Sequence, residues 1–141
     1  MKQILIFVLF AAMLCWIMFS PIYKHVLIVR QALLQKEVDY LLEVGANADH
    51  GYIDAAMIEK SRERLSRFGL QPDNIEFVVS ATDGKDATNP AAPLLRGTGL
   101  SLTMSYPFGR LLEIDRLIGL TPPAPDERMS ASGMKMSEYV P

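Results

Sequence analysis

The N-terminal part of the chain contains an unbroken hydrophobic segment. Residues 4–19 include no charged side chain, and the apolar stretch continues to residue 23. About 20 residues of α-helix extend roughly 30 Å, which matches the hydrocarbon thickness of a bilayer. The pattern therefore predicts a membrane-length helix. Its apolar surface is formed by Ile4, Leu5, Phe7, Val8, Phe10, Leu14, Trp16, Ile17 and Phe19.

Three alternatives compete with a retained membrane helix: a cleaved secretory signal, a lipoprotein signal and a buried core helix. Signal peptidase prefers small residues before its cleavage point, whereas this segment ends in bulky residues, a serine and Pro21. Two bulky residues also precede Cys15, where a lipoprotein signal would carry small ones. We therefore expect the segment to be retained as an uncleaved helix.

An amphipathic pattern continues the helix beyond the hydrophobic segment. Apolar residues recur at spacings of three and four, at Val26, Leu27, Leu33, Leu34, Val38, Leu41 and Leu42. We predict one helix over residues 3–44, kinked or locally unwound near Pro21, with Gly45 as its C-cap. The apolar stripe has two possible partners, which can coexist. It can fold against the chain's own small domain, or it can pack against copies of itself.

Residues 47–141 are predicted to form a small α+β head with an extended C-terminal tail, separate from the helix of residues 1–46. Asp54 is placed to cap a helix over residues 55–68. The fold class is therefore α+β. A long N-terminal helix is followed by a head with one or two helices and an antiparallel sheet of two to three strands.

The strands of the head are predicted from composition and alternation. Residues 75–81 are rich in β-branched and aromatic side chains, and within the predicted strand of residues 98–106 apolar and polar side chains alternate from Leu100 to Tyr106. Antiparallel pairing of these two strands across the long polar loop is the simplest topology. Residues 110–120 suit a short helix, and residues 127–140 suit either a frayed tail or a third strand.

Charge and reactive residues exclude several classes of function. The chain has 14 Lys and Arg against 16 Asp and Glu, and no basic face accumulates, so nucleic acid is not an expected partner. One cysteine excludes a disulfide scaffold. His25 and His50 are isolated, and no catalytic, cofactor-binding or metal-binding motif is present. We expect no enzyme activity, no cofactor and no metal.

Basic residues gather at two places along the chain. The predicted second helix carries Lys60, Arg62, Arg64 and Arg67 among two glutamates. A solvated, ion-paired face is the favoured interpretation, and a phosphate or lipid patch is the alternative. Lys24, Arg30 and Lys36 follow the hydrophobic segment, and they outweigh Lys2 and the terminal amine. By the positive-inside rule alone, this balance favours a cytoplasmic C-terminal domain.

The order of these parts resembles the TadE-like pseudopilins of the tight-adherence branch of type IV pilus systems. The motifs that carry the resemblance are Glu43-Val44-Gly45-Ala46, Phe68-Gly69-Leu70, Arg96-Gly97 and Tyr106-Pro107, within residues 3–107. Pro21 and Tyr23 are similar to the proline and nearby aromatic of pilin helices. The chain differs from ordinary pilins in having Leu5 where an acid is expected, and it shows no glycine-preceded processing site.

The resemblance implies a structural subunit of a type IV pilus-like filament at the cell surface. Such a subunit is stored in the inner membrane and assembled by helix packing. Its partners would be copies of itself, membrane lipid and pilus assembly machinery. Packing between subunits would use Val26, Leu27, Leu33, Leu34, Val38 and Leu41. The alternative is a membrane-anchored minor pseudopilin, or an assembly or secretion component, that forms no filament alone.

Overall fold

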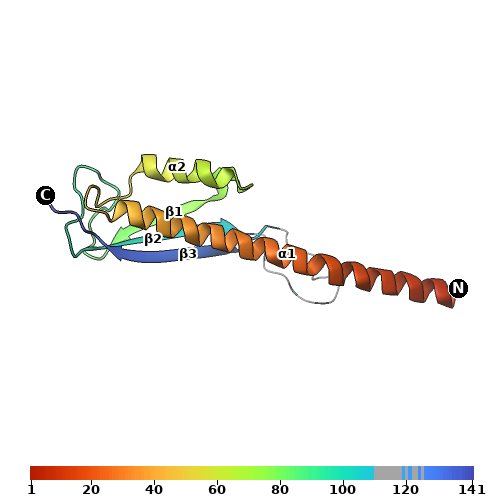
Figure 1. Cartoon of the computed structure of the whole chain (residues 1–141). Helices are drawn as coiled ribbons and strands as arrows, with labels where there is room; N and C mark the ends of the chain where they lie inside the picture. Colours follow the sequence, from red (N-terminus) through yellow and green to blue (C-terminus); the bar gives the residue numbers. More distant parts are fainter. Residues whose placement is uncertain (110–118, 120, 122–123, 125) are drawn as a thin grey trace. The chain divides into compact units, whose positions relative to one another are not determined.

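The computed structural model describes residues 1–109, 119, 121, 124 and 126–141 (Figure 1). Within these residues, two helices, a 3₁₀ turn and three strands follow one another: α1 (Lys2–Gly45), α2 (Ala55–Ser66), η1 (Pro72–Asn74), β1 (Glu76–Ala81), β2 (Gly99–Pro107) and β3 (Arg128–Met136). A long apolar helix, a short helix and a three-stranded antiparallel sheet confirm the predicted α+β class. The predicted helix over residues 110–120 lies outside the described residues.

The chain forms two compact units. The first consists of Met1–Arg30 and Phe108–Glu127, and the second of Gln31–Pro107 and Arg128–Pro141. The second unit holds the whole sheet, α2 and the C-terminal part of α1. The predicted domain boundary, between a helix of residues 1–46 and a head of residues 47–141, stays a prediction.

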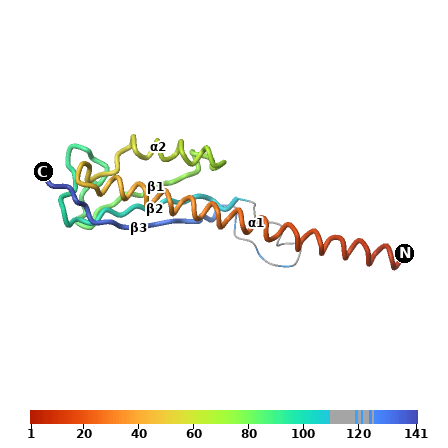
Figure 2. Tube along the Cα trace, viewed as in Figure 1, coloured from red at the N-terminus to blue at the C-terminus, as the bar shows by residue number. Residues whose placement is uncertain are grey.

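Helix α1 is continuous from Lys2 to Gly45, and Pro21 lies inside it. Of the two predicted alternatives at Pro21, local unwinding is therefore wrong, and a kink stays a prediction. Proline removes one backbone donor, and the helix continues on both sides of that single missing bond (Figure 2).

The predicted role of Gly45 as a C-cap was also wrong, because this residue does not have the positive φ of a left-handed cap. Its carbonyl instead accepts a 2.8 Å bond from the amide of Gly51, whose φ is 78°. A Cβ on Gly45 would lie 2.6 Å from Ile53 Cγ1 and 3.0 Å from the Tyr52 carbonyl oxygen. The glycine is needed for close packing at the end of the helix.

The sheet has the order β1-β2-β3 with both pairs antiparallel, which confirms the predicted pairing of the first two strands. Met104 of β2 lies between Phe77 of β1 and Ala131 of β3. Of the two interpretations of residues 127–140, the third strand is the correct one for Arg128–Met136. Gln31 and Gln35 of α1 donate to the carbonyls of Ser130 and Ser132, so side chains from α1 cover the outer edge of β3.

The core of the second unit lies between one face of the sheet and the two helices. Every second residue of β2 is buried on this face: Leu100, Leu102, Met104 and Tyr106. Helix α1 contributes Leu34, Val38, Leu41 and Leu42, and α2 contributes Leu65. The opposite face carries small polar residues of β2, namely Ser101, Thr103 and Ser105, which are only half-buried. The alternation predicted for this strand is therefore confirmed.

Candidate functional site: a groove and an exposed helix

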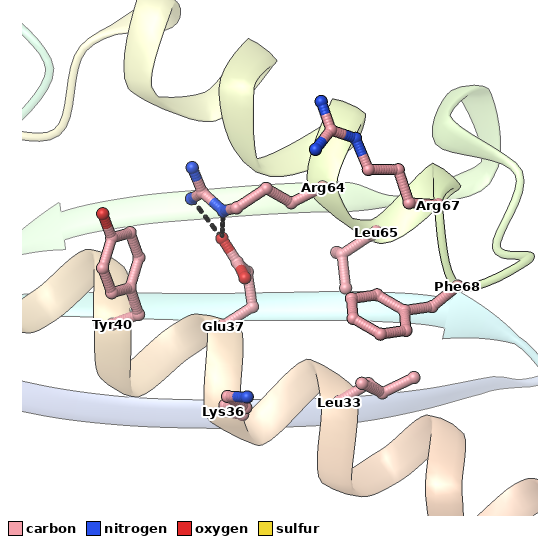
Figure 3. Close-up of a pocket in the computed structure, with 8 residues that line it drawn as sticks. All are labelled: Leu33, Lys36, Glu37, Tyr40, Arg64, Leu65, Arg67 and Phe68. Atoms are coloured by element: carbon pink, nitrogen blue, oxygen red, sulfur yellow. Dashed lines mark hydrogen bonds and ion pairs between the residues drawn. The ribbon is translucent and has the colours of Figure 1, made fainter.

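A groove lies between α1 and the C-terminal end of α2 in the second unit (Figure 3). Its volume is about 440 Å³. Helix α1 lines it with Leu33, Lys36, Glu37 and Tyr40, and the α2 side contributes Arg64, Leu65, Arg67 and Phe68. The four α1 residues are spaced three, one and three apart, and this spacing places them on one face of a helix.

A partly buried ion pair joins the two helices across this groove, with the Glu37 side chain 11% exposed and the Arg64 side chain 35% exposed. Glu37 is 9% exposed, and its Oε1 accepts a 2.9 Å bond from Nε of Arg64 and a second bond from Nη2 of the same guanidinium. That guanidinium also lies 4.7 Å from the centre of the Tyr40 ring. The pair neutralises the one carboxylate among the lining residues.

The remaining polar residues give the groove a positive rim. Lys36 is exposed, and Arg67 pairs with Glu63 at 3.2 Å on the solvent-facing side. Phe68 is 64% exposed beside them. Because exposed ion pairs contribute little, Arg67 is available to another partner. The groove can hold an apolar group flanked by negative charge.

Sequence reasoning missed this ion pair. Arg67 lies on the solvated, ion-paired face expected for α2, whereas Arg64 points toward Glu37 of α1. Arg62 donates to the carbonyls of Pro72 and Ile75 and lies 4.9 Å from the Phe77 ring centre. One available signal was the position of Glu37, four residues after Leu33 and four before Leu41, which placed its side chain on the apolar stripe.

The hydrophobic segment of α1 forms the second candidate surface. Eight of its predicted apolar residues are exposed by 44–69% of their surface: Ile4, Leu5, Phe7, Val8, Phe10, Leu14, Ile17 and Phe19. Trp16 is half-buried, and its indole N–H has no hydrogen-bond partner in the described part of the chain. Helix α1 is long and apolar enough to cross a membrane, with a mean hydropathy of 2.5 over its best window. It is compatible with a membrane anchor or a signal sequence.

The residues expected to pack between subunits divide into two groups. Leu34, Val38 and Leu41 are at most 1% exposed, because they pack into the core of their own chain. They have no surface left for a neighbour, so for these three residues the prediction is corrected. Val26, Leu27 and Leu33 are half-buried, and Leu33 also lines the groove.

The histidines do not form a reactive site in the described residues. His25 lines a pocket of about 430 Å³ along α1 in the first unit. In the second unit, Nδ1 of His50 lies 3.0 Å from Oδ1 of Asn47. Across residues 1–109, 119, 121, 124 and 126–141, no group of three potential metal ligands comes together.

The chain was also compared with known proteins. No protein-family model, curated protein or solved structure matches it. Its function is therefore inferred from the sequence, the exposed apolar helix and the groove.

Proposed function

We propose that this chain is a structural subunit of a type IV pilus-like extracellular filament. The observation that carries the proposal is the exposed apolar surface of α1 between Ile4 and Phe19. A helix that is apolar on all sides needs an apolar environment, which is either a bilayer or a bundle of similar helices. A filament subunit uses both environments, first the membrane and then the packed core.

The motifs that resemble TadE-like pseudopilins support this proposal. They occur at the end of α1, after α2, just before β2 and at the end of β2. A contact between different surfaces of identical subunits generates a helical filament when the rotation between neighbours does not close into a ring. The proposal places the chain in the inner membrane before assembly and at the cell surface afterwards. It assigns the chain no catalytic role.

Electron microscopy of sheared cell-surface material tests the proposal. Negatively stained filaments should be visible, and mass spectrometry of the same material should detect this chain. Cells that lack the chain should lose those filaments. Finding the protein only in membranes, under conditions in which filaments form, would contradict the proposal.

A second candidate function is a membrane-anchored minor pseudopilin, or an assembly or secretion component, that forms no filament alone. The observation that favours it is the group of Lys24, Arg30 and Lys36 after the hydrophobic segment, which by the positive-inside rule points to a cytoplasmic head. Protease treatment of intact cells and spheroplasts separates the two topologies. A head that is digested only after cell lysis is cytoplasmic, and this result would rule out the filament.

A further inference from the structure

We infer that the groove between α1 and α2 binds the acidic loop surface of a second copy of this chain. The acidic loop surface consists of residues 46–54, 82–98 and 137–141. This inference rests on the proposed function, because it supplies a contact between the heads of assembled copies. It deepens that function by naming the two surfaces that meet.

The groove offers apolar area and positive charge. Lys36, Arg64 and Arg67 provide three cations against the single carboxylate of Glu37, a balance of +2 among the lining residues. Glu63 pairs with Arg67 from outside the groove and reduces the local balance to +1. Phe68 is mostly exposed at the edge of the groove, beside half-buried Leu33. Its occupant should therefore present exposed carboxylates next to an apolar side chain.

The acidic loop surface has these properties. Its acids are Asp49, Asp54, Asp83, Asp86 and Glu138, and its cations are Lys85 and Arg96, which gives a balance of −3. Two apolar residues are exposed among them, Leu95 by 51% and Val140 by 61%. The charge and the apolar area of this surface are complementary to those of the groove.

Backbone bonds hold the loops together at the C-terminal end of α1. The amide of Gly51 donates to Gly45, and the amide of Glu138 donates to Ala46. The amide of Ile53 donates to Ala87, and the amide of Leu94 donates to Gly51. The surface is thus a fixed part of the second unit.

The groove begins earlier along the same helix, at Leu33. From Leu33 to Gly45 the axial rise is about 18 Å at 1.5 Å per residue. Because the two surfaces are displaced along α1, a contact between copies joins unlike patches and can repeat without closing. Copies related by such a displacement keep their α1 helices pointing in the same direction. Subunits taken from one membrane need this common direction.

Disulfide trapping between copies tests the contact. In a Cys15→Ser background, the double variant Phe68→Cys/Val140→Cys is expressed in cells and oxidised in the membrane. The expected product is a ladder of dimers, trimers and larger species, because every copy carries both halves of the contact. Each single variant is the matched control and should stay monomeric. Dimers from Phe68→Cys alone would instead indicate a symmetric pairing of grooves and would overturn the inference.

Charge reversal in the same trapping background tests the electrostatic part. Lys36→Glu/Arg67→Glu should reduce the ladder about tenfold, because like charges then face each other. Adding Asp83→Lys/Glu138→Lys should restore most of it. Lys60→Glu is the control, since this exposed α2 residue does not line the groove. A ladder that the reversal leaves unchanged, or that the second reversal fails to restore, would contradict the inference.

The outcomes separate this inference from the proposed function. Filaments without a ladder would overturn the contact and leave the filament proposal intact. A ladder without filaments would support the contact and contradict the filament proposal. If the double variant stays monomeric and its groove binds a different acidic protein, a second copy is not the occupant of the groove, and the inference is overturned.

Discussion

Among single residues, the buried carboxylate of Glu37 matters most for the groove, because its ion pair with Arg64 joins the two helices that form it. Glu37 has an 11% exposed side chain, and Arg64 provides its ion pair. Removing Arg64 leaves the mostly buried Glu37 carboxylate without its charged partner, which is costly because the carboxylate is shielded from most of the surrounding water. The neighbouring pair of Arg67 and Glu63 is 72% and 68% exposed, so water solvates both of its charges.

Arg64→Ala should therefore destabilise the head by about 1–3 kcal/mol, because Glu37 loses its charged partner. Arg67→Ala is the matched control on the same helix and should cost less than about 1 kcal/mol. Chemical denaturation of the full chain in detergent measures both changes. If the two variants lose the same free energy of unfolding, the burial of Glu37 does not add to the stability that its ion pair contributes.

The loop carboxylate of Asp86 predicts a pH effect. The hydroxyl and the backbone amide of Thr88 both donate to it, and they lower its pKa below the ordinary value of 3.8. A folded-state pKa below the unfolded one adds stability above the unfolded pKa, and this stability is lost as pH falls through the folded pKa. The melting temperature of Asp86→Ala should thus lie below that of the unchanged chain at pH 7, and the difference should close below about pH 4. A difference that is constant with pH would contradict this assignment.

At the scale of elements, packing fixes where α1 ends and which face of the sheet is buried. Gly45 allows the helix end to approach Ile53 and Leu100 closely. The buried face of β2 meets the helices, whereas the opposite sheet face carries exposed Val78 of β1. Two hydrophobic residues in neighbouring strands can therefore differ greatly in their effect on stability.

Gly45→Ala should destabilise the head by about 1–3 kcal/mol, because the added methyl group overpacks the contact with Ile53. Alanine favours helices more than glycine does, so propensity alone predicts the opposite sign. Denaturant titration of the full chain measures the direction of the change. A stabilised variant would mean that the end of α1 can move away from Ile53.

Leu102→Ala should cost about 2–5 kcal/mol, because it removes buried apolar volume from the centre of the sheet. Val78→Ala is the control on the open face and should stay within about 0.5 kcal/mol. Thermal unfolding followed by circular dichroism separates the two variants. A large loss in Val78→Ala would indicate that the open face is covered by another copy.

At the scale of the whole molecule, the apolar surface of α1 requires an environment that the described chain does not supply. Only 6% of its most hydrophobic window is buried. A charge placed in this segment would have to be buried in lipid or among other helices. In either environment an unpaired charge is costly.

Ala12→Asp should reduce membrane insertion, since an acid at the centre of a spanning helix costs about 2.5–3.5 kcal/mol. Ala48→Asp in the exposed loop of the second unit is the control and should insert normally. Carbonate extraction of membranes measures the inserted fraction. Full insertion of Ala12→Asp would exclude a span centred on this residue.

Features that depend on residues close together in the chain could be predicted before the fold was known. These are the apolar helix, the cap of α2 by Asp54, whose Oδ1 accepts a 2.9 Å bond from the amide of Met57, and the alternation of β2. Periodicity and capping act over a few residues, so they can be read from neighbours in the chain.

Contacts between residues far apart in the chain could not be predicted in this way, because they depend on how the elements pack. Glu37 and Arg64 are 27 positions apart, and their pairing depends on how α2 packs beside α1. The third strand formed because β2 offered it a partner edge, and Gly45 was needed because Ile53 returns to the helix end. A contact between distant residues depends on the folded chain around it, so composition and spacing could not specify the groove.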